Sequence, residues 1–206
     1  MTIELINIGK RFKKNWIFRG VNLFFTLGSS YAITGANGSG KSTLLKIIAG
    51  FDNYNFGNIL CIVNEKKIEK NDFCYLVSFC APYQELIREM TLVEFILFHQ
   101  KMTHTFDYTH MIETVGLKGN ENKLLNDFSS GMLQRLKLGI TFYSNKLVLL
   151  FDEPCTNLDD SGKEIFKSLF NKYKTQKLII LASNEHDEIS LCNKIIDIAL
   201  YKSVVS

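Results

Sequence analysis

The chain has 206 residues, of which 46% are hydrophobic and 22% charged, and its net charge at pH 7 is +3. These values are typical of a globular protein with a sizeable core, and the small, scattered positive charge gives no sign of nucleic-acid binding. The longest apolar runs, such as 147–151 and 178–182, are far too short to cross a bilayer, and the N-terminus lacks the regions of a signal peptide. We therefore expect a cytosolic protein.

The five cysteines form no C-x-x-C pair, and neither they nor the four histidines show the spacing of a metal site. An odd number of cysteines within apolar segments indicates reduced thiols packed in a core. No zinc centre is therefore expected.

The first 34 residues predict short β-strands. Apolar residues mark one strand between Ile3 and Ile8, and they alternate with other residues in a second between Val21 and Phe25. A third apolar stretch, Tyr31-Ala-Ile-Thr34, comes directly before a run of glycines.

That run, Gly35-Ala-Asn-Gly-Ser-Gly-Lys41-Ser42, leads into a helical pattern that ends near Ala49. Strand, glycine-rich loop and helix are the context of a phosphate-binding loop, in which backbone N–H groups and the helix N-terminus bind phosphate oxygens. We expect Lys41 to reach the β- and γ-phosphates and the Ser42 hydroxyl to bind Mg²⁺. The alternative is an incidental glycine turn. The residues predicted to bind the nucleotide are Gly35, Asn37, Gly38, Ser39, Gly40, Lys41, Ser42 and Thr43.

The middle of the chain changes from strands to helices. Two strand-like runs, Ile59–Val63 and Phe73–Phe79, are followed by a helical pattern from about Tyr83 to Gln134. A capping box, Thr91-Leu-Val-Glu94, opens a first helix. A second helix is predicted over 108–115, and a third begins at 129 or 130 with an apolar stripe that continues to 143.

Strands and helices then alternate again. The pattern predicts strands at 147–151, 178–182 and 195–201 and a helix over 161–173. Continuous apolar runs of this kind favour a parallel sheet covered on both faces. The sequence therefore predicts an α/β core that is interrupted by a helical insertion.

The strand at 147–151 is followed by two acids, Asp152 and Glu153. Ligands of a parallel sheet bind beyond the carboxyl ends of its strands, so Asp152 is expected near the phosphates, where it would hold Mg²⁺ through water. Glu153 is expected to orient or activate the attacking water. The alternative is a strand that simply ends in solvated acids.

The segment Phe128-Ser129-Ser130-Gly131-Met132 resembles the signature of the ATP-binding-cassette (ABC) ATPases, a Leu-Ser-Gly-Gly-Gln type sequence followed by a helix. A serine at a helix start, beside free N–H groups, suits a second clamp on a γ-phosphate. The resemblance extends over essentially the entire chain. It implies a head-to-tail dimer with two bound ATP molecules, in which Ser129 and Gly131 contact the nucleotide of the opposite subunit.

The resemblance also implies a fold: a P-loop NTPase (RecA-like) α/β core with a mainly parallel sheet, an N-terminal antiparallel β subdomain and a helical insertion. Residues 1–206 would form one ATPase domain, with a core at 1–82 and 137–206 and a helical subdomain at about 83–136. Asp159, in the segment Thr156-Asn-Leu-Asp159, would contact the second subunit. Phe12, or else Trp16, would stack on adenine, unless Phe12 is a core aromatic.

Two positions depart from the family pattern. At the first, the family has a glutamine that contacts Mg²⁺ or water. Alignment on Pro82 puts Tyr83 at that position, and a one-residue adjustment of the loop, which we favour, puts Gln84 there. Asn184 stands where the family has its switch histidine, and His186 lies two residues further on. Because Asn184 can donate a hydrogen bond but cannot carry a proton, we expect slow hydrolysis with intact ATP binding.

The function implied is that of the ATP-binding and ATP-hydrolysing subunit of an ABC transporter, similar to the compact ATPases of haem and multidrug exporters. It would form a homodimer, bind Mg²⁺ with ATP and drive a separate transmembrane permease from the inner face of the membrane, with no nucleic acid. The alternatives are a non-transport ABC ATPase of the ribosome or DNA, and a low-turnover nucleotide-binding regulator.

Five aromatic residues in and beside the helical insertion either pack in the core or line a groove that receives the permease. They are Phe79, Tyr83, Phe95, Phe98 and Phe106.

Overall fold

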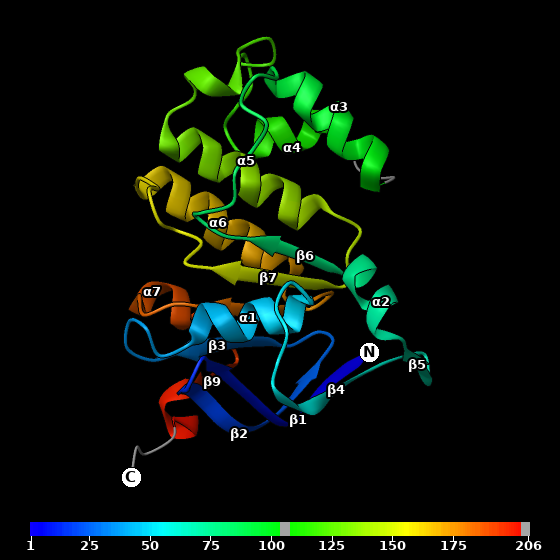
Figure 1. Ribbon diagram of the computed structural model, residues 1–206. Helices are drawn as coiled ribbons and strands as arrows, with labels where there is room; N and C mark the ends of the chain where they lie inside the picture. Colours follow the sequence, from blue (N-terminus) through cyan, green and yellow to red (C-terminus); the bar gives the residue numbers. More distant parts are fainter. Residues whose placement is uncertain (104–107, 203–206) are drawn as a thin grey trace. The chain divides into compact units, whose positions relative to one another are not determined.

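The computed structural model describes residues 1–103 and 108–202. The chain forms two compact units (Figure 1). The first comprises residues 1–79, 146–152 and 174–206, and the second comprises residues 80–145 and 153–173. The helical subdomain predicted at about 83–136 lies within the second unit, which also includes the helix predicted over 161–173. No helix of the described residues is long and apolar enough to cross a membrane.

A four-stranded antiparallel sheet begins the first unit, in the order β2-β1-β4-β5. Its strands are β1 (Thr2–Phe12), β2 (Asn15–Thr26), β4 (Phe56–Val63) and β5 (Lys66–Ile68). β1 pairs with both β2 and β4, and its alternating residues Ile3 and Leu5 are buried. The predicted N-terminal antiparallel β subdomain is therefore confirmed, with longer strands than expected.

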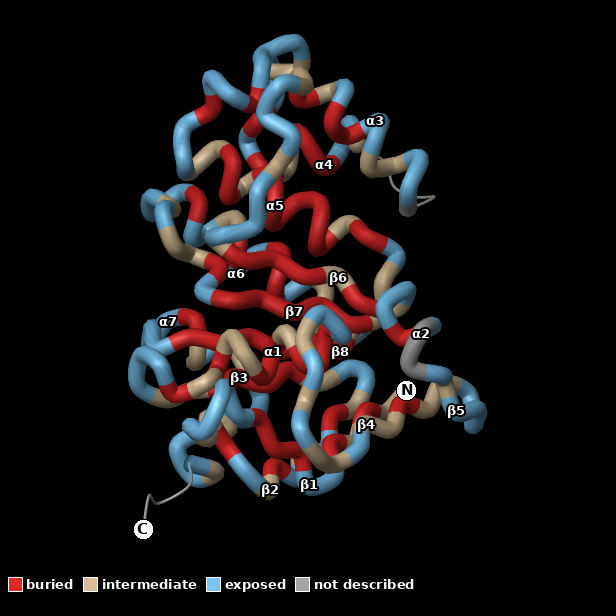
Figure 2. Tube along the Cα trace, in the orientation of Figure 1, coloured by how far each residue is buried: buried red, intermediate tan, exposed pale blue. Residues whose placement is uncertain are grey.

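The second sheet of this unit has five strands in the order β6-β7-β8-β3-β9. They are β6 (Val77–Cys80), β7 (Val148–Asp152), β8 (Leu178–Ala182), β3 (Ser30–Thr34) and β9 (Lys194–Asp197). The pairs β3–β8, β3–β9 and β7–β8 are parallel, and every residue of β7 and β8 is buried (Figure 2). α1 (Lys41–Ala49) contacts β7 and β8, and the short α7 (His186–Ile189) follows β8. The predicted parallel sheet is confirmed.

Two strand predictions are wrong in part. The run Phe73–Phe79 instead contains the end of α2 (Lys70–Phe73) and a 3₁₀ turn, and only the residues from Val77 onward form a strand. The last strand ends at Asp197, whose carboxylate accepts a hydrogen bond from the Ala199 N–H at 2.9 Å and caps a 3₁₀ turn over 198–201. Side-chain and backbone capping therefore redirects the chain in segments whose apolar pattern indicates a strand.

The second unit contains the helices α3 (Leu92–Thr103), α4 (Tyr108–Thr114), α5 (Ser130–Tyr143) and α6 (Asp160–Tyr173). α5 contacts both α4 and α6. The predicted capping box is confirmed, because the Glu94 carboxylate accepts from the Thr91 N–H at 2.8 Å and the Thr91 hydroxyl accepts from the Glu94 N–H at 3.3 Å. The apolar stripe of α5 is buried at Leu133, Leu136 and Ile140.

Candidate nucleotide site

The loop between β3 and α1 has the backbone of a phosphate cradle. Gly38 and Gly40 have φ angles of +76° and +105°, which favour glycine. A Cβ atom at Gly40 would lie 2.5 Å from Cγ2 of Ile17, whereas one at Gly38 would meet nothing within 4 Å. Gly40 therefore lets α1 begin close to β2, and Gly38 leaves open space beside the loop.

The Lys41 ammonium lies across this loop. Its side chain is 5% exposed, and Nζ donates to the carbonyl oxygen of Gly35 at 2.6 Å and to that of Ala36 at 3.4 Å. The Ser39 hydroxyl is also buried, and it has no hydrogen-bond partner among the described residues. A buried donor without a partner is costly, so this hydroxyl and the cation both fit an anion bound in the loop.

The Ser42 hydroxyl donates to Oδ1 of Asp152 at 2.9 Å. Ser42 lies in the first turn of α1, and Asp152 ends β7 and is only 2% exposed. A hydroxyl and a carboxylate are hard oxygen ligands, and Mg²⁺ in nucleotide sites uses few protein ligands together with substrate phosphates. These two side chains therefore fit Mg²⁺, and the described residues contain no group of three or more His, Cys, Asp and Glu side chains that would indicate another kind of metal centre.

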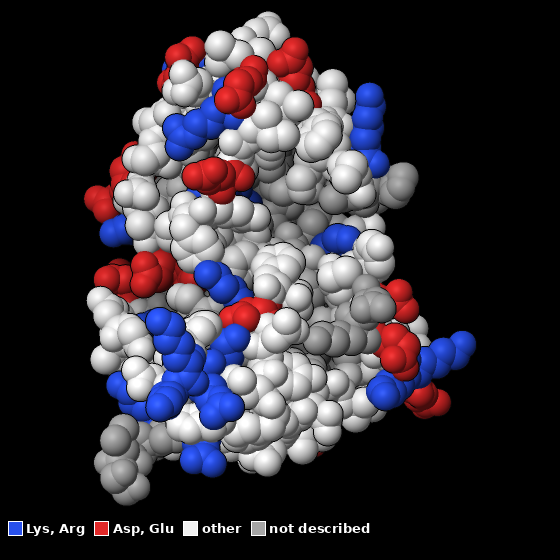
Figure 3. Space-filling model, in the orientation of Figure 1, with Lys and Arg blue, Asp and Glu red and all other residues white. Residues whose placement is uncertain are grey.

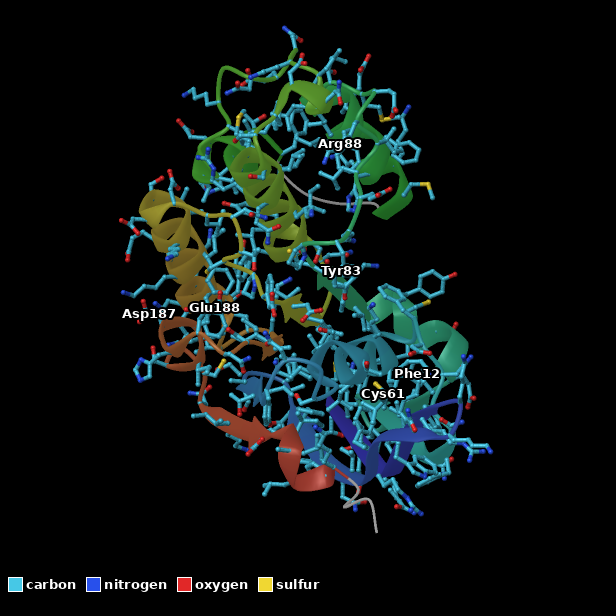
Figure 4. The ribbon with its side chains drawn as sticks, turned by 60° about the vertical axis from the view of Figure 1, so that its left-hand side comes forward. Phe12, Cys61, Tyr83, Arg88, Asp187 and Glu188 are labelled. Carbon is cyan, nitrogen blue, oxygen red and sulfur yellow. The ribbon has the colours of Figure 1, made fainter. Side chains whose placement is uncertain are left out.

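Asn184 lies in the loop after β8, and its Nδ2 donates to Oδ1 of Asn37 in the phosphate loop at 3.2 Å. The carboxyl ends of parallel β3, β7 and β8 lie at one edge of the sheet, and this geometry brings Asn184 to the predicted site. His186 is exposed and begins α7, whose Asp187 and Glu188 are labelled in Figure 4.

Phe12 is 51% exposed at the end of β1, so it is not a core aromatic (Figure 4). The Lys10 ammonium lies 4.8 Å from its ring centroid. Trp16 is less available, because its ring packs against Phe56 and lies 4.7 Å from the Arg19 guanidinium. The exposed cations of this hairpin are Arg11, Lys13, Lys14 and Arg19. Figure 3 shows basic side chains gathered over the first unit.

In the second unit, Glu153 is exposed and has a φ angle of +46°. Such a backbone conformation is uncommon for a residue with a side chain and is frequent at functional sites. The Glu153 carbonyl accepts from the Thr156 N–H at 3.2 Å, and the carbonyl of the next residue, Pro154, accepts from Nε2 of Gln134 at 2.7 Å. The turn that contains Glu153 is therefore fixed by hydrogen bonds to two consecutive carbonyls.

Ser129 caps α5, because its hydroxyl accepts from the Met132 N–H at 3.2 Å. A Cβ atom at Gly131 would lie 3.0 Å from the Asn157 carbonyl oxygen, so the signature segment packs closely on the loop 156–159. Asp159 caps α6 by accepting from the Gly162 N–H at 2.9 Å, which together with the Ser161 hydroxyl lowers the pKa of this exposed carboxyl.

Gln84 is exposed in the loop between β6 and α3, beside Tyr83, which is 52% exposed. The Gln84 N–H donates to the Ala81 carbonyl at 3.2 Å, and Nζ of Lys137 donates to the same oxygen at 3.2 Å. Sequence reasoning overlooked Lys137 and Gln134. Arg135 lies between them, so this stretch of helix has three polar residues, and their types do not mark which two are buried.

Comparison with known proteins agrees with this geometry. The model of the ABC transporter family matches residues 18–156, more than half of the chain. The cytochrome c biogenesis ATP-binding export protein CcmA of Aliivibrio fischeri is 28% identical, over 90% of this chain and 92% of its own length. The Fe(3+) ions import ATP-binding protein FbpC of Escherichia coli is also 28% identical, over 90% of this chain and 55% of its own length.

Among solved structures, a dimeric ATP-binding cassette in a post-hydrolysis state, bound to ADP and Pi, has the same fold. Its TM-score is 0.80 at 20% identity, and the match covers 95% of this chain and 93% of that chain. The fold prediction, a P-loop NTPase α/β core, is confirmed. The chain belongs to the ABC transporter family, as one of its ATP-binding ATPases.

Proposed function

We propose that this chain drives a separate transmembrane permease, as a homodimer on the inner face of the cell membrane, and that the transporter is an exporter. The observation that carries the proposal is the hydrogen bond between Ser42 and Asp152 beside the Lys41 cradle, which combines a phosphate site with oxygen ligands for a divalent cation. We also propose that residues 1–206 act as one ATPase domain, with a core at 1–82 and 137–206 and a helical subdomain at about 83–136.

ATP would bind mainly to the first unit. Lys41 and the loop N–H groups bind the β- and γ-phosphates, and the Ser39 hydroxyl, which lacks a partner among the described residues, supplies a further donor. Ser42, Asp152 and Gln84 would hold Mg²⁺, which neutralises phosphate charge when bound. Phe12 provides an exposed ring face for adenine. The cations of the β1–β2 hairpin favour an anionic ligand there.

Hydrolysis would depend on Glu153, whose carboxylate accepts a proton from water or orients it. The unusual backbone conformation of this residue supports a functional role. Asn184 would donate a hydrogen bond to the γ-phosphate. Because an amide cannot take up or give away a proton, turnover would be slow.

The dimer is supported by the signature segment. Ser129 and Gly131 would bind the γ-phosphate of the nucleotide in the other subunit, at the N-terminus of α5. The carboxylate of Asp159 is engaged as the cap of α6, so it would act on the second subunit by holding in place the loop 156–159, in which Asn157 and Asp159 are exposed.

Exposed apolar side chains of the second unit suit a permease contact. On α3, Leu97, Phe98 and Met102 are 41%, 42% and 71% exposed. Of the aromatic residues predicted to be core or groove, Phe79 and Phe95 are buried, Tyr83 and Phe98 are exposed, and Phe106 lies outside the described residues. Apolar surface of this kind is typical of protein–protein contact.

Export is proposed because CcmA carries out export according to its name and matches over nearly its full length. A second candidate, a low-turnover nucleotide-dependent regulator, is favoured by one observation: Asn184 occupies the position next to the phosphate loop where a proton-carrying histidine would stand. Co-purification separates the two, because a transporter subunit brings down a membrane protein.

The test is ATP turnover and oligomeric state in Mg·ATP for the wild type, Glu153→Gln and the control Glu164→Gln, which changes an exposed glutamate of α6. We expect Glu153→Gln to bind ATP, to lose turnover by roughly 10²–10³-fold and to accumulate as an ATP-bound dimer. Glu164→Gln should behave as the wild type. Failure of the wild type to bind ATP would refute the proposal, and a monomeric Glu153→Gln would refute the assigned role of Ser129.

A further inference from the structure

α5 contains three buried polar side chains, Gln134, Lys137 and Thr141. Gln134 and Lys137 are three residues apart and are 2% and 8% exposed. Lysine is among the residues that are least often buried, and a buried ammonium normally pairs with a carboxylate. Among the described residues, no Asp or Glu forms an ion pair with Lys137.

The side chains of Gln134 and Lys137 both donate to backbone carbonyls of loops, and Nε2 of Gln134 also donates to Sγ of Cys80 at 4.0 Å. Nζ of Lys137 donates to the Pro82 carbonyl at 2.8 Å and to the Ala81 carbonyl at 3.2 Å. The Ala81 oxygen also accepts a hydrogen bond from the N–H of Gln84. The ammonium therefore binds the same carbonyl that forms the turn from Ala81 to Gln84. Gln134 holds the Pro154 carbonyl, next to Glu153, in the corresponding way.

A neutral core would be the simpler solution for stability. Burial lowers the pKa of Lys137, and the positive charge of Arg88 lowers it further, while Cys80 has the opposite effect. Replacing a buried ion pair by well-packed apolar residues is often neutral or stabilising. Charge-assisted hydrogen bonds, however, are roughly twice as strong as neutral ones, which makes Lys137 suited to fixing a loop.

We propose that Lys137 is a positioning residue whose ammonium holds the Ala81 and Pro82 carbonyls so that the loop presents Gln84 in a single conformation. Tyr83 and Arg88, labelled in Figure 4, lie on the same segment. This inference rests on the proposed function, which places Gln84 at Mg²⁺ or the attacking water. Lys137 acts through the loop and touches neither ATP nor water in this proposal.

The experiment compares the wild type with Lys137→Met, Lys137→Arg and the control Lys177→Met. Lys177 is the matched control, because it is a half-buried lysine of the first unit whose Nζ also donates to a backbone carbonyl, that of Lys146. Hydrogen exchange of the amides of 83–86 is measured with ATP turnover and ATP affinity. Exchange in α6 reports on the fold as a whole. If Lys137→Met fails to fold, Lys137→Gln replaces it.

In Lys137→Met we expect the amides of 83–86 to exchange at least about 10-fold faster, with α6 unchanged. The same variant should lose about 10-fold in kcat while KM and ATP affinity change less than about twofold, because misplaced groups affect the reaction rather than binding. Lys137→Arg, which keeps the charged donors, should restore both properties, and Lys177→Met should leave the loop unchanged.

Unchanged exchange at 83–86 in Lys137→Met would overturn the proposal. So would equally faster exchange in α6, which would show a general structural role. If the loop responds as expected but the wild type neither binds nor hydrolyses ATP, the proposed function fails while the positioning role of Lys137 stands.

Discussion

The predicted site residues of the two units differ in how they are held. In the first unit, Lys41 and Asp152 are almost fully buried and form hydrogen bonds within the site, from Lys41 to the loop carbonyls and from Ser42 to Asp152. In the second unit, Gln84 and Glu153 are exposed, and the hydrogen bonds that hold them come from their own turns and from α5.

This difference indicates two kinds of preorganisation. Buried groups such as Lys41, bonded to the loop carbonyls, and Asp152, bonded to Ser42, form a site within one unit, which is suited to phosphate. Exposed groups such as Ser129, at the N-terminus of a helix, offer hydrogen-bond donors to a ligand that is held on another surface. The first unit is therefore expected to set the affinity for the nucleotide. The second unit is expected to set the hydrolysis and the dimerisation that follow binding.

The largest expected effect on nucleotide affinity is that of Lys41→Ala. The ammonium is buried in the cradle, and charge-assisted hydrogen bonds contribute about 1.5–3 kcal/mol, so ATP affinity should fall by roughly 100-fold. Fluorescent-nucleotide titration measures this effect, and Lys67→Ala, an exposed lysine of β5, is the control. An affinity within a few-fold of wild type would contradict the view that the first unit holds the phosphates.

A smaller effect is expected for Asn184→His, which restores a group able to carry a proton beside Asn37. Turnover should rise by about 10-fold, at the low end of general acid–base effects, with ATP affinity unchanged. Phosphate release is the measurement. His186→Asn is the control and should leave turnover unchanged, because His186 is exposed on α7. Equal turnover in Asn184→His and wild type would contradict the explanation of slow hydrolysis.

The smallest effect is expected for Ser129→Ala. Loss of its cap should lower the free energy of unfolding by about 1 kcal/mol, measured by urea denaturation. Ser129→Asp keeps a good cap, so it should have the stability of the wild type. Its negative charge would repel the γ-phosphate, so Ser129→Asp combined with Glu153→Gln should not form the ATP-bound dimer. Dimerisation of that double variant to the wild-type extent would contradict the proposed phosphate clamp.

Much of the fold was predictable because its signals are local. The glycine-rich loop and the Thr91 capping box each occupy a few consecutive residues, and the structure contains both. The failures have local causes as well: Asp197 caps a 3₁₀ turn where the apolar pattern indicates a continuing strand, and helical turns occupy most of Phe73–Phe79.

The site was predictable in part. Motif spacing singled out Ser42 and Asp152 although 110 residues separate them, because each follows a recognisable element. It could not find Lys137, whose partners Ala81 and Pro82 lie in a distant loop and present only backbone carbonyls. Every residue has such a carbonyl, so a sequence pattern contains no mark of that contact.

The sequence alone determined the family resemblance, the phosphate loop and the alternation of strands and helices, because each depends on residue types at short spacing. Only the tertiary structure decided that Phe12 is exposed, that Asn184 meets Asn37 and that Lys137 closes the turn before Gln84. The physical reason is that burial and hydrogen bonds between distant segments depend on how the elements pack, and packing depends on the whole chain.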